Sequence, residues 1–181
     1  MGRLRFNRLQ LLGATLPAEV LIQTGTGPHS DGLADCAPHF KTLHSIELDR
    51  GRHTRAARIL ASLKNVILHL GDSCRVLPRL FEPKRKTLFF LDAHCPPDAT
   101  AAQCPLMAEL DIIFAATWKW PPDIIIDDSR MFQDWFWKRG GKSRHYDRRQ
   151  WPRMKEIIFA AGRFGYGTAV ADGAVILKKV Q

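Results

Sequence analysis

The stretch DIIIDDSR, residues 123–130, places two adjacent aspartates directly after a run of three isoleucines. Three β-branched residues in a row favour an extended strand, and an unbroken apolar run suits a strand that is buried on both faces. The carboxylates of Asp127 and Asp128 repel each other, and they are costly to keep beside such a core unless another group neutralises them. The pair therefore indicates either a strand end that turns into solvent or a strand end that belongs to a functional site.

Short apolar runs and helical patterns alternate on both sides of this strand. Strands are predicted at residues 20–23, 42–48, 65–70, 87–91 and 124–126, and helices at 50–63, 76–81, 105–116 and 151–162. Two further strands, 166–170 and 175–179, flank a tight turn and form an antiparallel hairpin. The pattern predicts an α/β fold with a doubly wound, Rossmann-like sheet, mostly parallel with a C-terminal antiparallel hairpin and with helices on both faces.

The size and composition predict a single soluble domain over residues 1–181, with 45% hydrophobic and 25% charged residues. Polar residues interrupt the apolar part of the N-terminus, so residues 1–14 are interpreted as an amphipathic helix rather than a secretory signal. Residues 129–150 are basic and contain glycines, and they are predicted to form a loop. No apolar run approaches the roughly 20 residues needed to span a bilayer, and a cytoplasmic location is expected.

Charge and cysteine content narrow the partners that we expect. The net charge of +9 favours an anionic partner, such as a nucleic acid, a phosphorylated sugar or an acidic glycan, although solubility alone also accounts for it. The four cysteines show no framework spacing, so reduced thiols are expected. A zinc site at His94, Cys95 and Cys104 is conceivable, but the sequence contains no CxxC pair.

Acidic residues follow each predicted parallel strand after the first. They are Glu47, Asp72, Asp92, Asp127 and Asp128. In open α/β sheets, ligands bind beyond the carboxyl ends of the strands, where such residues gather at one edge. Turn chemistry explains each acid alone, but five acids on one edge outline a site.

The turn after the first strand, QTGTG at residues 23–27, matches only part of the dinucleotide fingerprint. Gly25 and Gly27 fit its opening GxG, but Ser30 stands where the third glycine is required, which disfavours an NAD-dependent oxidoreductase. Glu47 follows about 20 residues later, where an acid can accept hydrogen bonds from the two hydroxyls of a ribose. The arrangement suits an adenosine-bearing ligand without a pyrophosphate.

Five motifs in this order and spacing resemble the class I S-adenosylmethionine-dependent methyltransferases: QTGTG, SIELD, GDS, FFLDAH and IIIDDSR. In that family the glycine turn approaches the methionine part of the cofactor, the acid after the second strand binds the ribose, and the acid after the third strand faces the adenine. The resemblance thus implies an S-adenosylmethionine site formed by Gln23, Thr24, Gly25, Gly27, Glu47, Leu48, Asp72 and Ser73.

Gln23 departs from the pattern of that family, whose first strand usually ends in an acid. An amide can hydrogen-bond the cofactor but cannot pair ionically with its ammonium group. A non-catalytic remnant of the fold is therefore one alternative function.

One subgroup of the family, the metal-dependent O-methyltransferases of the catechol and macrolide-sugar types, holds a divalent cation at the ends of the fourth and fifth strands. Asp92, Asp127 and Asp128 occupy the corresponding positions, which implies Mg²⁺ bound by hard oxygen ligands. Such an ion would lower the pKa of an acceptor hydroxyl. The catechol-type lysine base is absent, and His94, next but one to Asp92, is its replacement as general base, with a turn or supporting role as the alternative.

These residues together predict a metal-assisted O-methyltransferase acting on a hydroxyl of a saccharide or another small polyhydroxylated acceptor, a class that includes anionic acceptors. Acceptor contacts are expected from the loop 93–104, from the loop 129–150 and from the aromatic residues 135–137, which could equally pack as a hydrophobic cap. The alternative from another class is an RNA-directed methyltransferase or nucleic-acid-binding protein that uses the basic surface.

Overall fold

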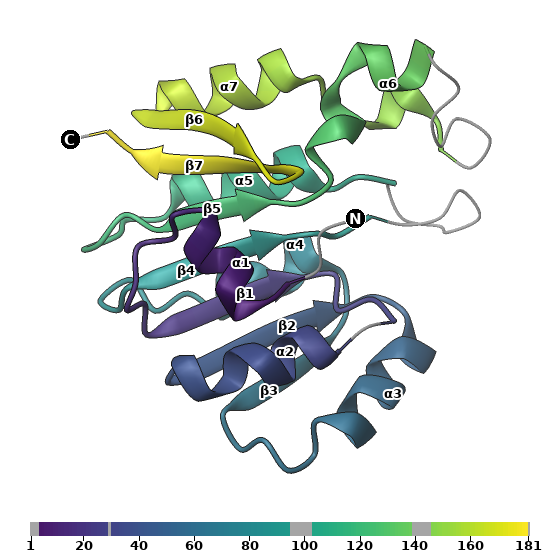
Figure 1. Cartoon of the computed structure of the whole chain (residues 1–181), viewed down its shortest axis with the longest axis vertical. Coiled ribbons are helices and arrows are strands. Elements are labelled where there is room, and N and C mark those ends of the chain that lie inside the picture. The colour runs from purple at the N-terminus through teal and green to yellow at the C-terminus, as the bar shows by residue number, and fades with distance from the viewer. Residues whose placement is uncertain (1–3, 29, 95–102, 139–145, 181) are drawn as a thin grey trace.

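A seven-stranded sheet runs through the centre of the computed structural model, which describes residues 4–28, 30–94, 103–138 and 146–180 (Figure 1). The strands lie in the order β3-β2-β1-β4-β5-β7-β6, with β1 to β5 parallel, β7 antiparallel to β5 and β6 antiparallel to β7. Their bounds are β1 Val20–Thr24, β2 Thr42–Glu47, β3 Val66–Leu70, β4 Thr87–Leu91, β5 Asp123–Ile126, β6 Tyr166–Ala171 and β7 Ala174–Lys179. The predicted fold class is confirmed.

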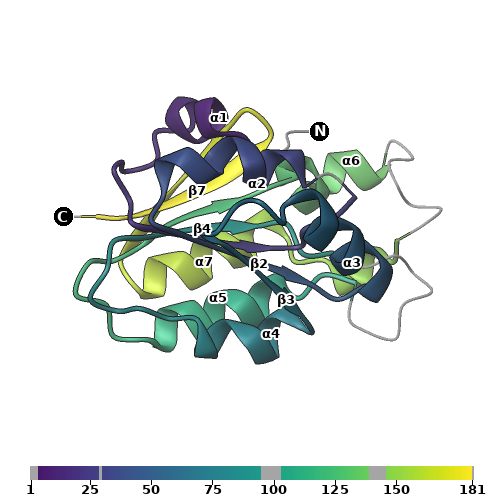
Figure 2. The ribbon, with the colours of Figure 1, turned by 90° about the horizontal axis from the view of Figure 1, so that it is seen from below.

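Helices cover both faces of this sheet. The α-helices are α1 Phe6–Leu11, α2 Asp31–Cys36, α3 Arg50–Ile59, α4 Ser73–Val76, α5 Leu106–Ala115, α6 Asp134–Lys138 and α7 Met154–Arg163, and short 3-10 helices are η1 Ala37–His39, η2 Leu77–Arg79, η3 Ser129–Phe132 and η5 Arg148–Gln150. Figure 2 shows α1 and α2 on one side of the sheet and α4, α5 and α7 on the other. None of the described helices has the length and apolar character that a membrane crossing needs.

Alternate side chains of the central strands enter two separate cores, because successive residues of a strand point to opposite faces. In β4, Phe89 and Leu91 join the core under α5 and α7, whereas Leu88 and Phe90 join the core under α1, α2 and α3. All four side chains are at most 2% exposed. Burial of each contributes about 1.5–3 kcal/mol, so this strand anchors both layers.

Three local features differ from the prediction. Residues 31–36 form the short helix α2, where no helix was predicted; it buries Leu33 and Cys36 but is too short to display a helical period. Helix α4 begins at Ser73, three residues before the predicted helix, because the Asp72 side chain caps it by accepting a hydrogen bond from the Cys74 N–H. The predicted loop 129–150 contains η3, α6 and η5 in its described part.

The first helix and the hairpin meet at the end of β5. Arg8 on α1 is 6% exposed, and its guanidinium donates to a carboxylate oxygen of Asp127 at 2.9 Å. It also donates to the carboxylate of Asp172 at 2.9 Å and to the Asp172 carbonyl at 2.8 Å. Asp172 and Gly173 both have positive φ values, 44° and 72°, which suit the tight turn between β6 and β7. A single arginine thus joins α1, β5 and the hairpin.

Candidate functional site

The carboxyl ends of the parallel strands meet at one edge of the sheet. Thr24 at the end of β1 pairs with Ile46 on β2 and with Leu91 on β4, and Leu91 pairs with Ile126 at the end of β5. The residues that follow these strands, including all five predicted acids, therefore lie along the same edge.

The glycine turn after β1 packs directly against the end of β4. Gly25 and Gly27 have φ values of 77° and 64°, in the left-handed region that favours glycine. A Cβ atom on Gly25 would lie 2.5 Å from the carbonyl oxygen of Asp92, which no real side chain tolerates. The Asp92 N–H in turn donates to the Thr24 carbonyl at 3.0 Å. The first strand end and the fourth are thus held in fixed register.

Glu47 fastens this turn to β2. The side chain is 5% exposed, and one carboxylate oxygen accepts from the Gly27 N–H at 2.8 Å while the other accepts from the Asp49 N–H at 2.9 Å. Each oxygen keeps a second lone pair that can accept from a ligand hydroxyl. Leu48 beside it is 43% exposed, so the edge next to Glu47 is open to a ligand.

Gln23 lies beneath the turn. Its amide N–H₂ donates to the Gly25 carbonyl at 3.1 Å, and its amide oxygen accepts from the Ser45 hydroxyl at 3.4 Å. The Ser45 hydroxyl also shares a hydrogen bond of 2.7 Å with Thr26. An ionised carboxylate could not donate to the Gly25 carbonyl, so an amide suits this position for reasons of the turn itself.

Asp72 and Ser73 lie at the start of α4, beyond β3. The Asp72 carboxylate is committed on one oxygen to the Cys74 N–H at 2.8 Å, and Ser73 is 7% exposed. Both predicted adenine contacts therefore stand at the edge, next to the end of β2.

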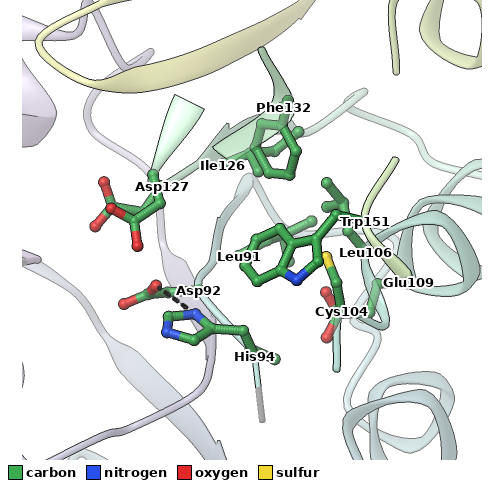
Figure 3. A pocket seen from close by; sticks show the side chains of 12 residues that line it. Leu91, Asp92, His94, Cys104, Leu106, Glu109, Ile126, Asp127, Phe132 and Trp151 are labelled. Atoms are coloured by element: carbon green, nitrogen blue, oxygen red, sulfur yellow. Dashed lines mark ion pairs between the residues drawn. The ribbon is translucent and has the colours of Figure 1, made fainter. Parts of the chain in front are cut away.

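A pocket lies between the ends of β4 and β5 (Figure 3). Asp92, His94 and Asp128 all line it, and one ligand atom from each lies within 4.8 Å of the others. The His94 Nδ1 atom is 3.6 Å from Asp92 Oδ1. Asp128 adopts the left-handed conformation, with φ 56° and ψ 41°, which turns the chain sharply after β5. The three residues form a group that could hold a metal ion.

Asp127, the third metal ligand expected from the sequence, is bound to Arg8. Burial raises the pKa of Asp127 while Arg8 opposes that effect. Burial alone would lower the pKa of Arg8, but Asp127 and Asp172 raise it. We take the pair as ionised, because the guanidinium makes three hydrogen bonds of 2.8–2.9 Å to these two aspartates. The structure thus brings Asp92 and Asp128 together with His94, and directs Asp127 to Arg8.

Glu109 on α5 is a residue of this pocket that the sequence analysis missed. It is 1% exposed, and burial raises its pKa to about 7. The hydroxyls of Ser73 and Thr24 work in the opposite direction, so the carboxyl stands beside the predicted cofactor residues. The signal was present in the sequence: Glu109 interrupts the apolar face of a predicted helix, three residues after Leu106 and four before Ile113.

Aromatic side chains surround the pocket beyond His94. The His94 ring lies 6.0 Å from the Tyr146 ring and 5.8 Å from the Trp151 ring, with Trp151 at 5% exposure. Of the aromatic residues expected to contact an acceptor, Trp137 donates from its indole to the Met131 carbonyl, whereas Trp135 is 52% exposed. Trp137 therefore packs inward, and Trp135 is available at the surface. Cys95, one of the three residues considered for a zinc site, lies outside the described residues.

Solved structures of other proteins share this fold. No protein-family model and no curated protein matches the sequence. A caffeoyl-CoA O-methyltransferase candidate from Staphylococcus aureus matches over 99% of this chain and 85% of its own, with 16% identity and a TM-score of 0.64. An rRNA methylase from Streptococcus thermophilus matches over 91% and 88%, with 13% identity and a TM-score of 0.52.

A third structure, a phosphoethanolamine N-methyltransferase 2 from Haemonchus contortus in complex with S-adenosylhomocysteine, matches over 89% of this chain and 37% of its own. Its identity is 16% and its TM-score is 0.57. At these identities the similarity shows the fold alone: the chain has the Rossmann-like fold of S-adenosylmethionine-dependent methyltransferases.

Proposed function

We propose that this protein is an S-adenosylmethionine-dependent methyltransferase that transfers the methyl group to a hydroxyl of a saccharide or another small polyhydroxylated acceptor, assisted by a divalent cation. One observation carries the proposal. The glycine turn held by buried Glu47 lies directly against the strand end that supplies Asp92, so a cofactor site and a possible ion site adjoin. Methyl transfer needs this proximity, because the donor carbon and the acceptor oxygen must be held about 3 Å apart.

The cofactor half of the proposal rests on donors and acceptors already in position. An added Cβ at Gly27 would meet no described atom within 4 Å, so the methionine part can approach the backbone there, while Gly25 allows the close contact with Asp92. Glu47 offers a lone pair on each oxygen to the ribose hydroxyls, and Asp72 with Ser73 faces the adenine. Gln23 serves the turn rather than the ammonium group in this assignment.

The ion half of the proposal uses Asp92, His94 and Asp128. Two ligands bound at about 2.1 Å from one ion lie roughly 3.0–4.2 Å apart, and the His94 Nδ1 to Asp92 Oδ1 distance of 3.6 Å fits that range. Two carboxylates and an imidazole suit Mg²⁺ less than an all-oxygen set does, and they admit Mn²⁺ and other divalent metals. Asp127 takes part indirectly, since its bond to Arg8 fixes the turn that carries Asp128.

When bound, a divalent cation would lower the pKa of an acceptor hydroxyl so that it is deprotonated near neutral pH. The chain itself positions the reactants. Asp92 is fixed by its N–H bond to Thr24, and the left-handed turn at Asp128 directs that side chain to the pocket. His94 and Trp151 form the wall facing the acceptor and exclude water from it.

His94 can serve this chemistry in two ways that exclude each other at Nδ1. We assign it to the cation, because its ring belongs to the three-residue group. As the general base predicted from the sequence, it would instead donate Nδ1–H to Asp92 and accept the acceptor proton at Nε2. In His94→Ala the first role predicts loss of the stabilisation by Mn²⁺, and the second predicts an intact metal response with loss of turnover.

The RNA-directed alternative draws on the net charge of +9 and on the similarity to the rRNA methylase. It predicts RNA binding that weakens steeply as the salt concentration rises, since phosphate contacts release counterions. A small acceptor predicts little dependence on salt.

Calorimetric titration with S-adenosylmethionine tests the proposal at its base. We expect saturable binding, and weaker binding after Glu47→Gln. A non-catalytic remnant predicts no heat of binding in either protein, and that result would overturn the proposed function.

A further inference from the structure

Glu109 is a buried acid that has no cation beside it in the described ranges of the chain. It lies on α5 among the apolar side chains of the core under α5 and α7 and is 1% exposed. In the described part of the chain, the groups that act on its carboxyl are Ser73, Thr24 and Asp72, and none of them carries a positive charge. A buried carboxylate is unfavourable unless it is paired, so this position has a cost that the fold itself does not offset.

Hydrogen bonding around Glu109 is also incomplete. Among the described residues, the Glu109 Oε1 atom and the Thr24 hydroxyl are buried and lack a hydrogen-bond partner, as does the buried indole N–H of Trp151, which lines the same pocket. Thr24 lies close enough to lower the pKa of Glu109, yet neither of these two atoms completes a hydrogen bond of normal geometry. Orphaned buried polar atoms require an explanation, and here they gather between the glycine turn and the pocket.

The acids at this end of the sheet differ in the cations that the described residues place beside them. Asp127 is paired with Arg8, and Asp128 has Arg130 at 3.9 Å. Glu109 has neither kind of neighbour among its described contacts. Glu109 lies next to Thr24, which belongs to the turn that we assign to the methionine part of the cofactor. That part of the cofactor carries a sulfonium and an ammonium group.

We propose that Glu109 is the buried counter-charge for the cationic methionine end of the cofactor, a role that neutral Gln23 cannot fill. The inference rests on the proposed function. It makes Glu109 a positioning residue that acts through the protein interior and through Thr24, because its oxygen is not exposed to a ligand. It also makes the site selective for a positively charged sulfonium over the uncharged thioether that remains after methyl transfer.

The comparison of two ligands that differ in this charge provides the test. Binding is measured by calorimetry with S-adenosylmethionine and with S-adenosylhomocysteine in the presence of chelator. We expect Glu109→Gln to weaken the binding of S-adenosylmethionine about tenfold or more, and to weaken the binding of S-adenosylhomocysteine by a factor several times smaller. The isosteric amide removes the charge and keeps the shape, so the variant should fold. Asp111→Asn on the exposed side of the same helix is the matched control, and both affinities should stay unchanged.

Proton release gives a second readout. Arrival of a cation favours the ionised carboxyl, so binding of S-adenosylmethionine near pH 7 should release up to about half a proton, measured in buffers of different ionisation enthalpy. Other titratable groups face this region: Asp72 and Cys74 on α4, Asp92 and His94 after β4, Asp127 and Asp128 after β5, and Cys104 before α5. Only the difference between wild type and Glu109→Gln is therefore assigned to Glu109.

Equal losses for both ligands, or unchanged binding and unchanged proton release in Glu109→Gln, would overturn the counter-charge. Absence of binding to wild type would overturn the proposed function itself, and the inference with it.

Discussion

At the ends of β1, β2 and β3, polar side chains accept or donate hydrogen bonds within the turns beside them. Gln23, Glu47 and Asp72 each bind a backbone group two to twenty residues away. At the ends of β4 and β5 the side chains face a pocket instead, where Asp92 and Asp128 approach each other and one Glu109 oxygen has no hydrogen-bond partner in the part of the chain that the structure describes. The first half of the edge is organised by the chain alone. In the second half, the described ion pairs of the acids include the buried Arg8 with Asp127 and the more exposed Arg130 with Asp128.

This difference indicates that the ends of β4 and β5, rather than those of β1, β2 and β3, depend on a ligand. A turn whose acids are satisfied by N–H groups is rigid before a cofactor arrives, and little ordering remains to be done on binding. A cluster of acids is strained by repulsion until a cation or a proton arrives. Stability of the second half should therefore respond to pH and to ions, and stability of the first half should not.

The largest effect is expected from Arg8→Ala, which removes the cation that balances the second half. Two aspartates would lose hydrogen bonds, and Asp127 would remain as an unpaired buried charge. Removing one partner of a buried pair costs about 3–5 kcal/mol. Urea unfolding at pH 7 should show this loss in the free energy of unfolding.

Arg5→Ala, at the residue just before the same helix, is the control, since its ion pair with Asp31 is half exposed and should contribute less than about 1 kcal/mol. Equal losses in both variants would show that the Arg8 pair is not special.

The pH dependence of stability tests Glu109. Its pKa is raised from 4.5 to about 7 by burial, so its contribution is fully present below pH 4.5, where both folded and unfolded states are protonated. It is lost as the pH rises to about 7, at a cost of about 3 kcal/mol. Urea unfolding of wild type and Glu109→Gln from pH 4.5 to 8 should diverge by that amount, with the variant more stable at high pH. Parallel curves would show that the carboxyl is solvated.

Divalent cations should stabilise the protein through Asp128. At an Mn²⁺ concentration of 100 times Kd, linkage gives about 2.7 kcal/mol, or a rise in Tm of roughly 5–10 °C. Asp128→Asn should abolish this rise. Asp127→Asn should keep it despite a lower starting Tm, because that carboxylate is bound to Arg8. Loss of the metal response in Asp127→Asn would instead support the ligand set expected from the sequence.

The smallest effect should come from the first half of the edge. Glu47→Gln keeps one acceptor for the Gly27 or Asp49 N–H but loses an acceptor for the ribose. We expect cofactor affinity to fall by about 1–3 kcal/mol, or roughly 5- to 150-fold, with the cation response unchanged. Asp49→Asn, which keeps the cap of α3, is the control. Unchanged calorimetric affinity in Glu47→Gln would exclude the ribose assignment.

The positions of the strands along the chain could be predicted because buried parallel strands appear in the sequence as continuous apolar runs. The sequence analysis placed all seven strands to within two residues at either end. Helix α2 could not be predicted, since six residues with two buried side chains carry no measurable period. Helix α4 begins where it does because the Asp72 side chain accepts one capping hydrogen bond, and the same residues are equally typical of a simple turn.

The site divides in the same way. Acids at strand ends were predictable, because the topology of a parallel sheet brings those ends to one edge. The pairing of Asp127 with Arg8 was not, since 119 positions separate the two residues and no local pattern joins them. The local pattern treats Asp127 and Asp128 as equivalent, whereas the left-handed turn at Asp128 gives them different partners.

The bond from Arg8 to Asp172 has a consequence for the synthesis of the chain. The two residues are 164 positions apart, so ribosomes that add about 5–20 residues per second make α1 roughly 10–30 s before the hairpin that binds it. During that interval Arg8 lacks Asp172, and β5 lacks its neighbour β7. The nascent chain therefore exposes an unpaired strand edge until its last two strands are made.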